Sequence, residues 1–193
     1  MILPKLKLES RVNQILNESG IDSLKLCPNR RHFKLFPYSV QYNYNSRGFR
    51  DTEWPADDKL NDCIWCFGDS FTVGIGSPLK HTWVNLLQEK TGKRCINVSM
   101  DGASNEWIAD KVIEVAEAVN PKQMVVQWSY GNRAQSDDKS LSDEDRKIHN
   151  QYVEIHEQVS AFKNAVDRVS NFPIVHSVIP HAFPNNRPSR DTW

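Results

Sequence analysis

A serine follows a short apolar run near the end of the first third of the chain. Residues 63–67 read Cys-Ile-Trp-Cys-Phe, and Gly68, Asp69 and Ser70 follow at once. A short apolar run closed by a glycine turn is typical of a strand that is buried on both faces of a parallel sheet. Ser70 is then expected just beyond the carboxyl end of that strand, at the edge where open α/β sheets bind ligands. Its hydroxyl is a candidate nucleophile, although Gly-Asp-Ser is also a common turn tripeptide.

Two further motifs flank this serine in the sequence. Residues 45–51 read Asn-Ser-Arg-Gly-Phe-Arg-Asp, residues 68–76 contain the serine, and residues 96–102 read Ile-Asn-Val-Ser-Met-Asp-Gly. In type and order these motifs resemble those of the SGNH (GDSL-like) hydrolase family, from about residue 45 to residue 132. The resemblance implies a three-layer α/β/α fold with a flavodoxin-like sheet. It also implies a serine ester hydrolase that forms an acyl-enzyme at Ser70 and needs no metal or cofactor.

Acyl transfer at a serine requires a base for the hydroxyl proton and N–H donors for the oxyanion that develops on the ester carbonyl. The resemblance implies that these donors are the backbone N–H groups of Ser70 and Gly102 and the side chain of Asn132. Gly102 also suits a simple turn before a helix. His181 is the candidate base, because it follows a predicted strand at residues 173–179 and is expected at the same sheet edge as Ser70.

Two features depart from the family's pattern. Residues 131–133 read Gly-Asn-Arg where the family has Gly-x-Asn-Asp, and the family's C-terminal Asp-x-x-His spacing does not occur. Three alternatives fit the second departure: the sequence stops before the family's final strand and histidine, His181 serves as the base, or the protein binds a ligand without cleaving it. The expected function is hydrolysis of a small ester, such as an O-acetylated carbohydrate. The alternative is a catalytically impaired binding or scaffold protein.

Length and charge limit the other classes of function. A chain of 193 residues suffices for one well-buried domain. It carries 24 basic and 24 acidic side chains, so no net field attracts nucleic acid or an anionic membrane. Basic and aromatic residues in the stretch 30–44 also suit single-stranded nucleic acid, but the neutral charge argues against that partner. We expect no nucleic-acid or membrane partner. Because the sequence shows neither a signal peptide nor a membrane-spanning run, we expect a cytoplasmic protein.

The chain is expected to divide into two regions. Residues 1–54 are predicted to form an N-terminal helix, at about 9–19, and an extended aromatic and basic arm packed on the domain. Residues 55–193 are predicted to form the SGNH-like α/β hydrolase domain, in which the family's C-terminal strand and Asp-x-x-His are not recognised.

Strand and helix patterns alternate along the second region. Strands are predicted at 63–67, 94–98, 124–128 and 173–179, and helices at 82–92, from Ser104 to Pro121, and from about 142 onward. This alternation predicts an α/β fold with a parallel, doubly wound sheet and right-handed connections. Finer expectations are that Asp69 shapes the serine turn, that Leu86 points inward, that His176 is a buried, hydrogen-bonded core residue, and that the cysteines are reduced and buried.

Overall fold

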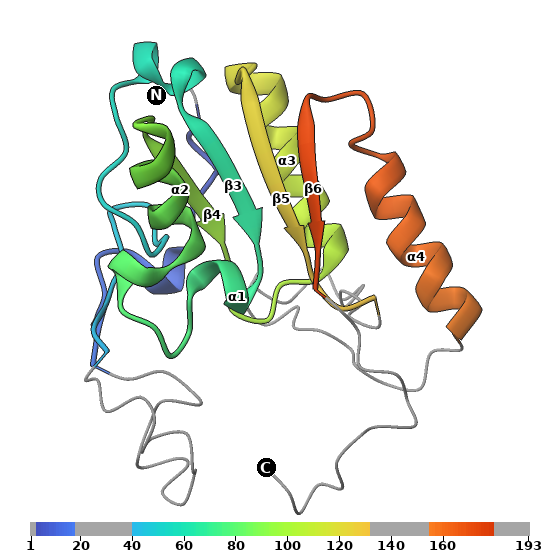
Figure 1. Ribbon diagram of the computed structural model, residues 1–193, viewed down its shortest axis with the longest axis horizontal. Helices are drawn as coiled ribbons and strands as arrows, with labels where there is room; N and C mark the ends of the chain where they lie inside the picture. Colours follow the sequence, from blue (N-terminus) through green and yellow to red (C-terminus); the bar gives the residue numbers. More distant parts are fainter. Residues whose placement is uncertain (1–2, 18–39, 132–154, 180–193) are drawn as a thin grey trace, which may run out of the picture.

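The computed structural model describes residues 3–17, 40–131 and 155–179. Four strands form a parallel sheet in the order β4-β3-β5-β6 (Figure 1); they are β3 (Ile64–Gly68), β4 (Cys95–Ser99), β5 (Gln123–Trp128) and β6 (Ile174–Val178). β3 lies inside the sheet and is buried at every position, as its apolar run predicts. Because β4 lies on one side of β3 and β5 on the other, the winding of the chain changes direction there.

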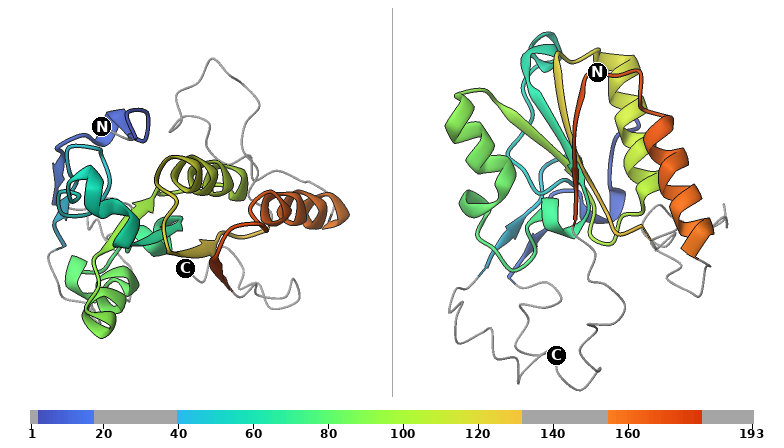
Figure 2. Two further views of the ribbon diagram at one scale, coloured as in Figure 1. Left: turned by 90° about the horizontal axis from the view of Figure 1, so that it is seen from above. Right: turned by 45° about the vertical axis from the view of Figure 1, so that its right-hand side comes forward.

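Helices cover both faces of this sheet (Figure 2). α2 (Trp83–Thr91) lies on one face, and α3 (Asn105–Val119) and α4 (Ile155–Asp167) lie on the other. The predicted helix ends are confirmed for α2 and α3. Ser104 Oγ accepts a hydrogen bond from Trp107 N at 3.1 Å at the start of α3, and Gly92 ends α2 in the left-handed conformation, with φ +65°. The described chain is therefore the predicted α/β fold, a parallel sheet flanked by helices. The predicted start of α4 at about 142 lies outside the described residues.

The larger hydrophobic core lies between the sheet and α3. It includes strand residues Trp65, Phe67, Met124 and Val126 and helix residues Trp107, Ile108, Val112 and Val115. A smaller cluster under α2 contains Ile64, Cys66, Val84 and Cys95. Leu86 is 40% exposed, so the prediction that it points inward was wrong: α2 packs on this cluster through Trp83, Val84 and Leu87. Cys63, Cys66 and Cys95 are buried and free, as predicted, and burial raises the pKa of the Cys66 thiol.

The N-terminal segment differs from its prediction. The expected helix at 9–19 is wrong over its described part, because Glu9–Arg11 forms one 3₁₀ turn (η1) and Ile15–Leu16 (β1) pairs antiparallel with Tyr42–Asn43 (β2). Between the turn and the strand, Asn13 has φ +54°, which interrupts a right-handed helix. The segment is anchored in the core by three leucines outside the expected helical stripe, namely Leu3, Leu6 and Leu8.

The remaining described elements are short. Shortly after Trp54 the chain forms a 3₁₀ helix, η4 (Asp57–Asp62). The four-residue helix α1 (Ser70–Val73) follows β3, and a second 3₁₀ helix, η5 (Leu79–His81), precedes α2. Within the three described ranges, no helix is long and apolar enough to cross a membrane.

The two edges of the sheet differ. On β4, the amides of Cys95 and Asn97 donate to the side chains of Gln88 and Asp51, each at 3.0 Å, so side chains occupy that edge. On β6, Val175 is 65% and Val178 59% exposed.

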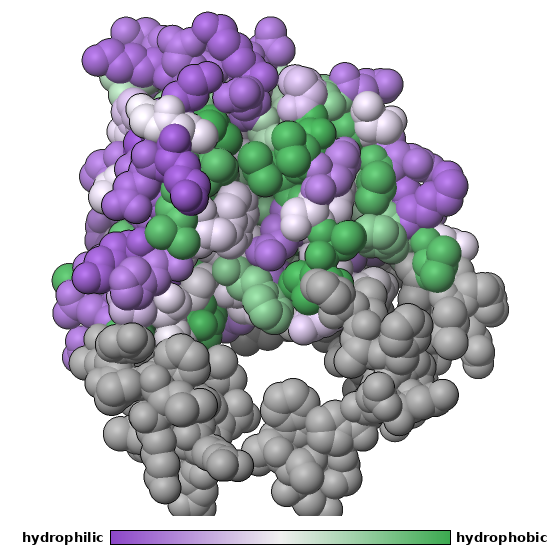
Figure 3. All heavy atoms as spheres, viewed as in Figure 1, coloured by the Kyte–Doolittle hydropathy of each residue, from purple (hydrophilic) through white to green (hydrophobic). Residues whose placement is uncertain are grey.

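An apolar groove lies on the sheet face beside α2, and Figure 3 shows apolar residues gathered on this side of the molecule. The groove is lined by Ile64, Trp83, Leu87, Val125, Pro173 and Val175, among others.

Candidate active site

The turn that carries Ser70 is fixed by the preceding aspartate. Asp69 is fully buried and caps α1: its Oδ1 accepts from Phe71 N at 3.0 Å, and its carbonyl accepts from Thr72 N and Val73 N, each at 2.9 Å. This confirms that Asp69 shapes the turn. Gly68 has no room for a side chain, because a Cβ there would collide with Thr72 Oγ1 and lie 3.0 Å from a backbone carbonyl of β5. Ser70 thus begins a helix directly beyond the carboxyl end of a buried strand.

The loop after β4 reaches the same edge. Met100 N donates to Gly68 O at 3.3 Å, which joins this loop to the serine turn. Gly102 follows with φ +80°, a conformation that favours glycine, and lies in the turn that leads into α3. The turn interpretation of Gly102 is therefore correct, and the same turn presents its backbone at the sheet edge that carries Ser70.

The loop after β5 is tied to both of the others. Ser129 Oγ donates to Asp69 Oδ2 at 2.6 Å. Asn105, the first residue of α3, accepts from Ser129 N at 2.8 Å and donates to Tyr130 O at 3.2 Å. The loops after β3, β4 and β5 are thus joined to one another by hydrogen bonds. Sequence reasoning missed Ser129 and Asn105; the signal available was a serine directly after a buried strand and an asparagine directly after a helix cap.

Two predicted site residues, Asn132 and His181, lie outside the described residues. Ser70 is only partly buried, and no hydrogen bond to its hydroxyl is found in the described chain. His176 accepts a hydrogen bond from Trp128 Nε1 at 3.0 Å and stacks on that ring, which confirms the predicted hydrogen bond. The predicted burial of His176 was wrong: His176 is exposed on β6, which is an edge strand of the sheet formed by the described residues.

Arg50, from the motif at residues 45–51, binds the C-terminal end of α1, the helix that begins with Ser70. Its buried guanidinium donates to Val73 O at 2.9 Å, Gly74 O at 2.6 Å and Ser77 O at 2.8 Å. It also stacks on the ring of Tyr42, with 4.1 Å between the guanidinium carbon and the ring centroid. The arginine therefore binds the carbonyls at the end of α1 and in the glycine loop that follows.

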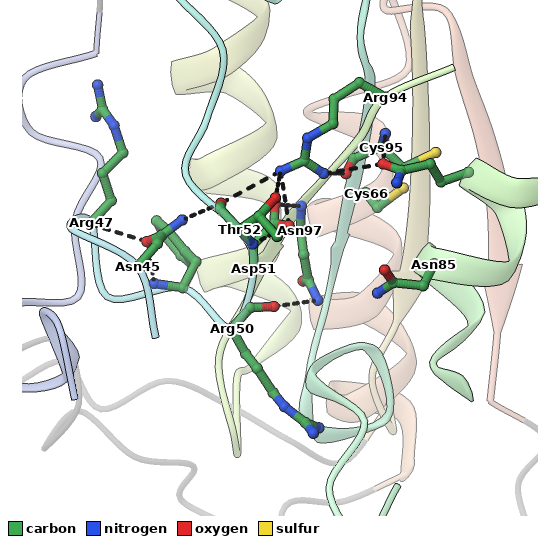
Figure 4. Close-up of polar contacts among 12 residues, drawn as sticks. Asn45, Arg47, Arg50, Asp51, Thr52, Cys66, Asn85, Arg94, Cys95 and Asn97 are labelled. Carbon is green, nitrogen blue, oxygen red and sulfur yellow. Dashed lines mark hydrogen bonds and ion pairs between the residues drawn. The ribbon is translucent and has the colours of Figure 1, made fainter. Parts of the chain in front are cut away.

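Asp51, from the same motif, joins the N-terminal segment to β4 (Figure 4). Its Oδ1 lies 2.9 Å from Arg94 Nη2, and its Oδ2 accepts from Asn97 N at 3.0 Å. Burial raises the pKa of Asp51, and the charge of Arg94 acts in the opposite direction. Within the motif, Asn45 Oδ1 accepts from the backbone N–H groups of Arg47 and Phe49. The described polar contacts of this motif support the fold around the serine turn.

Comparison with known proteins gives structural neighbours only. No protein-family model and no curated protein matches the sequence. The structure is similar to a member of the lipolytic protein G-D-S-L family from Veillonella parvula DSM 2008, with a TM-score of 0.41, 19% identity, and coverage of 60% of this chain and 56% of that one. It is also similar to AlinE4, an SGNH-hydrolase family esterase, with a TM-score of 0.39, 21% identity, and coverage of 65% of this chain and 62% of that one.

These structural neighbours are thus SGNH/GDSL esterases at low sequence identity, the family that the sequence motifs resemble. The matched region spans less than two thirds of the length of either of these proteins.

Proposed function

We propose that the protein is a serine ester hydrolase of the SGNH type. The observation that supports this proposal is the junction of three loops at one sheet edge: the Asp69–Ser70 turn, the Gly102 turn and the Ser129–Tyr130 segment are joined by hydrogen bonds. This arrangement supports the proposal, because hydrogen-bond donors from the loops of two neighbouring strands can approach a serine that begins a helix between them.

In the proposed reaction, His181 takes the proton of the Ser70 hydroxyl, and Oγ attacks the carbonyl carbon of the ester. The backbone N–H groups of Ser70 and Gly102 and the side chain of Asn132 donate to the oxyanion. The alcohol leaves with the proton from His181, and a water molecule then hydrolyses the acyl-enzyme by the same route. The proposed substrate is a small ester, such as an O-acetylated carbohydrate.

The test is hydrolysis of simple acetate esters by the wild type and by matched variants. We expect Ser70→Ala and His181→Ala each to lower kcat by about 10⁴-fold or more, because the nucleophile and its base act as a unit. Ser170→Ala is the control for the serine, since Ser170 is exposed and its hydroxyl donates only to Asp167 O among described groups. Full activity in Ser70→Ala would contradict the proposal.

A second candidate function is binding of an ester without cleavage. It is favoured by one observation: the Asp-x-x-His spacing that carries the base in the family does not occur in this sequence. Under this alternative the wild type binds an acetate ester but does not release acetate, and His181→Ala changes nothing.

A further inference from the structure

An exposed aromatic ring lies next to the candidate nucleophile. Phe71 is 49% exposed, and among the described residues it is the only phenylalanine, tyrosine or tryptophan exposed to this degree. Its backbone is fixed, because its N–H donates to the buried Asp69 carboxylate at 3.0 Å. Covering such an exposed apolar ring with a ligand is favourable, because it removes apolar surface from water.

Tyr130 supports this ring from the loop after β5. The ring centroids of Phe71 and Tyr130 lie 6.1 Å apart, and the ring planes meet at 77°, an edge-to-face pair. The carbonyl of Tyr130 accepts from Asn105 Nδ2 at 3.2 Å, and the neighbouring Ser129 donates to Asp69. The same hydrogen bonds that join the loops therefore hold the two rings against each other. We call these two residues the aromatic pair.

In the sequence, the aromatic pair lies close to the candidate nucleophile and to one candidate oxyanion donor. Phe71 directly follows Ser70, and Tyr130 precedes the candidate oxyanion donor Asn132 by two residues. A ligand group that stacks on these rings is expected to present a flat apolar face.

We propose that the aromatic pair binds a six-membered ring of the ester substrate, stacked on Phe71 beside the bond to be cleaved. Both a phenyl ring and the C–H face of a pyranose have the required flat apolar surface. This inference rests on the proposed function, because it assigns part of the substrate of the same site. Phe71 is thus a specificity-determining residue and takes no part in bond making or breaking.

The catalytic test uses three acetates that share one acyl group. Benzyl acetate and a methyl 6-O-acetylglucopyranoside carry a ring, and ethyl acetate does not. We expect Phe71→Ala to lower the preference for the ring esters, measured as the ratio of kcat/KM to that of ethyl acetate, by about two- to tenfold. Phe71→Tyr should retain the preference. Leu86→Ala, which truncates another exposed side chain on α2, is the control and should leave the ratio unchanged. The ring ester whose kcat/KM ratio falls more in Phe71→Ala carries the ring that the pair prefers.

A binding test is independent of catalysis. Saturation-transfer NMR with benzyl alcohol and methyl glucopyranoside should show transfer from the wild type to at least one ring, and Phe71→Ala should abolish it. Binding of neither ring to the wild type, or binding that survives Phe71→Ala, would overturn the inference. A wild type that binds a ring but cleaves none of the three acetates would contradict the proposed function and leave the ring surface standing.

Discussion

Ser129 joins two of the three loops at the candidate site through a single hydroxyl. Its hydrogen bond to the buried Asp69 carboxylate, at 2.6 Å, spans 60 residues of sequence. We expect Ser129→Ala to destabilise the protein by about 1–3 kcal/mol, because a buried carboxylate loses one of its donors. The same change should slow acylation of Ser70, since the turn that carries it is less firmly held. Urea unfolding and acetate hydrolysis measure the two effects.

Two variants sharpen this prediction. Ser129→Thr keeps a hydroxyl donor and should recover most of both losses. Ser170→Ala removes an exposed hydroxyl and should change stability by no more than about 0.5 kcal/mol. A Ser129→Ala variant as stable and as active as the Ser170→Ala variant would show that the hydroxyl does not hold the loops.

The residues of the candidate site were predictable to different degrees. Ser70 and Gly102 could be assigned because each follows an apolar run that encodes a strand, and strand ends can be read from sequence. Asn105 and Ser129 could not, because their roles depend on hydrogen bonds across 24 residues or more of chain. The exposure of His176 could not be predicted either. The residue pattern of one strand does not tell whether another strand pairs with its outer edge.

At the scale of elements, the Asp51 carboxylate joins the N-terminal segment to β4. Burial raises its pKa, so the folded protein binds the proton more tightly than the unfolded chain does. This group therefore destabilises the fold as pH rises from the unfolded pKa of about 4 through the higher folded pKa. The substitution Asp51→Asn keeps an acceptor for Asn97 N but removes the titrating group. We expect this variant to gain stability relative to the wild type as pH rises through this window.

Urea unfolding of both proteins between pH 4 and pH 7 measures this difference. Asp62→Asn is the control, because Asp62 is fully exposed in its pair with Lys122. If the Asp51→Asn variant instead loses stability relative to the wild type with rising pH, the attraction of Arg94 outweighs burial at Asp51.

Elements with their own boundary signals were predicted well. α3 begins at the Ser104 cap and ends at Asn120, just before Pro121, and both limits are local features of sequence. The helix expected at 9–19 was wrong because Val12, Ile15 and Leu16 have helical spacing, yet Ile15 and Leu16 pair with Tyr42–Asn43. Pairing with a distant strand outweighed a weak local preference.

At the scale of the whole molecule, β6 is an edge strand of the sheet that the described residues form, and we expect this edge to favour self-association. β6 contains no charged residue or proline, and Val175 is 65% exposed beside the apolar groove. Lysine on an edge strand opposes pairing with another strand. We therefore expect Val175→Lys to raise the concentration at which aggregates form by light scattering, with stability changed by no more than about 0.5 kcal/mol.

Val159→Lys provides the matched control, since Val159 is 60% exposed and belongs to helix α4, not to a strand. It adds the same charge and should have a smaller effect. Equal protection by the two substitutions would mean that net charge, and not the β6 edge, governs solubility.

The most direct test of the central claim is labelling of the purified protein with a fluorophosphonate, followed by peptide mapping. An activated serine forms a covalent adduct with this probe, whereas an ordinary surface serine does not. We predict one adduct, on Ser70, that is absent from Ser70→Ala and retained in Ser170→Ala. A wild type that remains unlabelled under conditions that label a control esterase, or an adduct on another serine, would contradict the claim that Ser70 is a nucleophile.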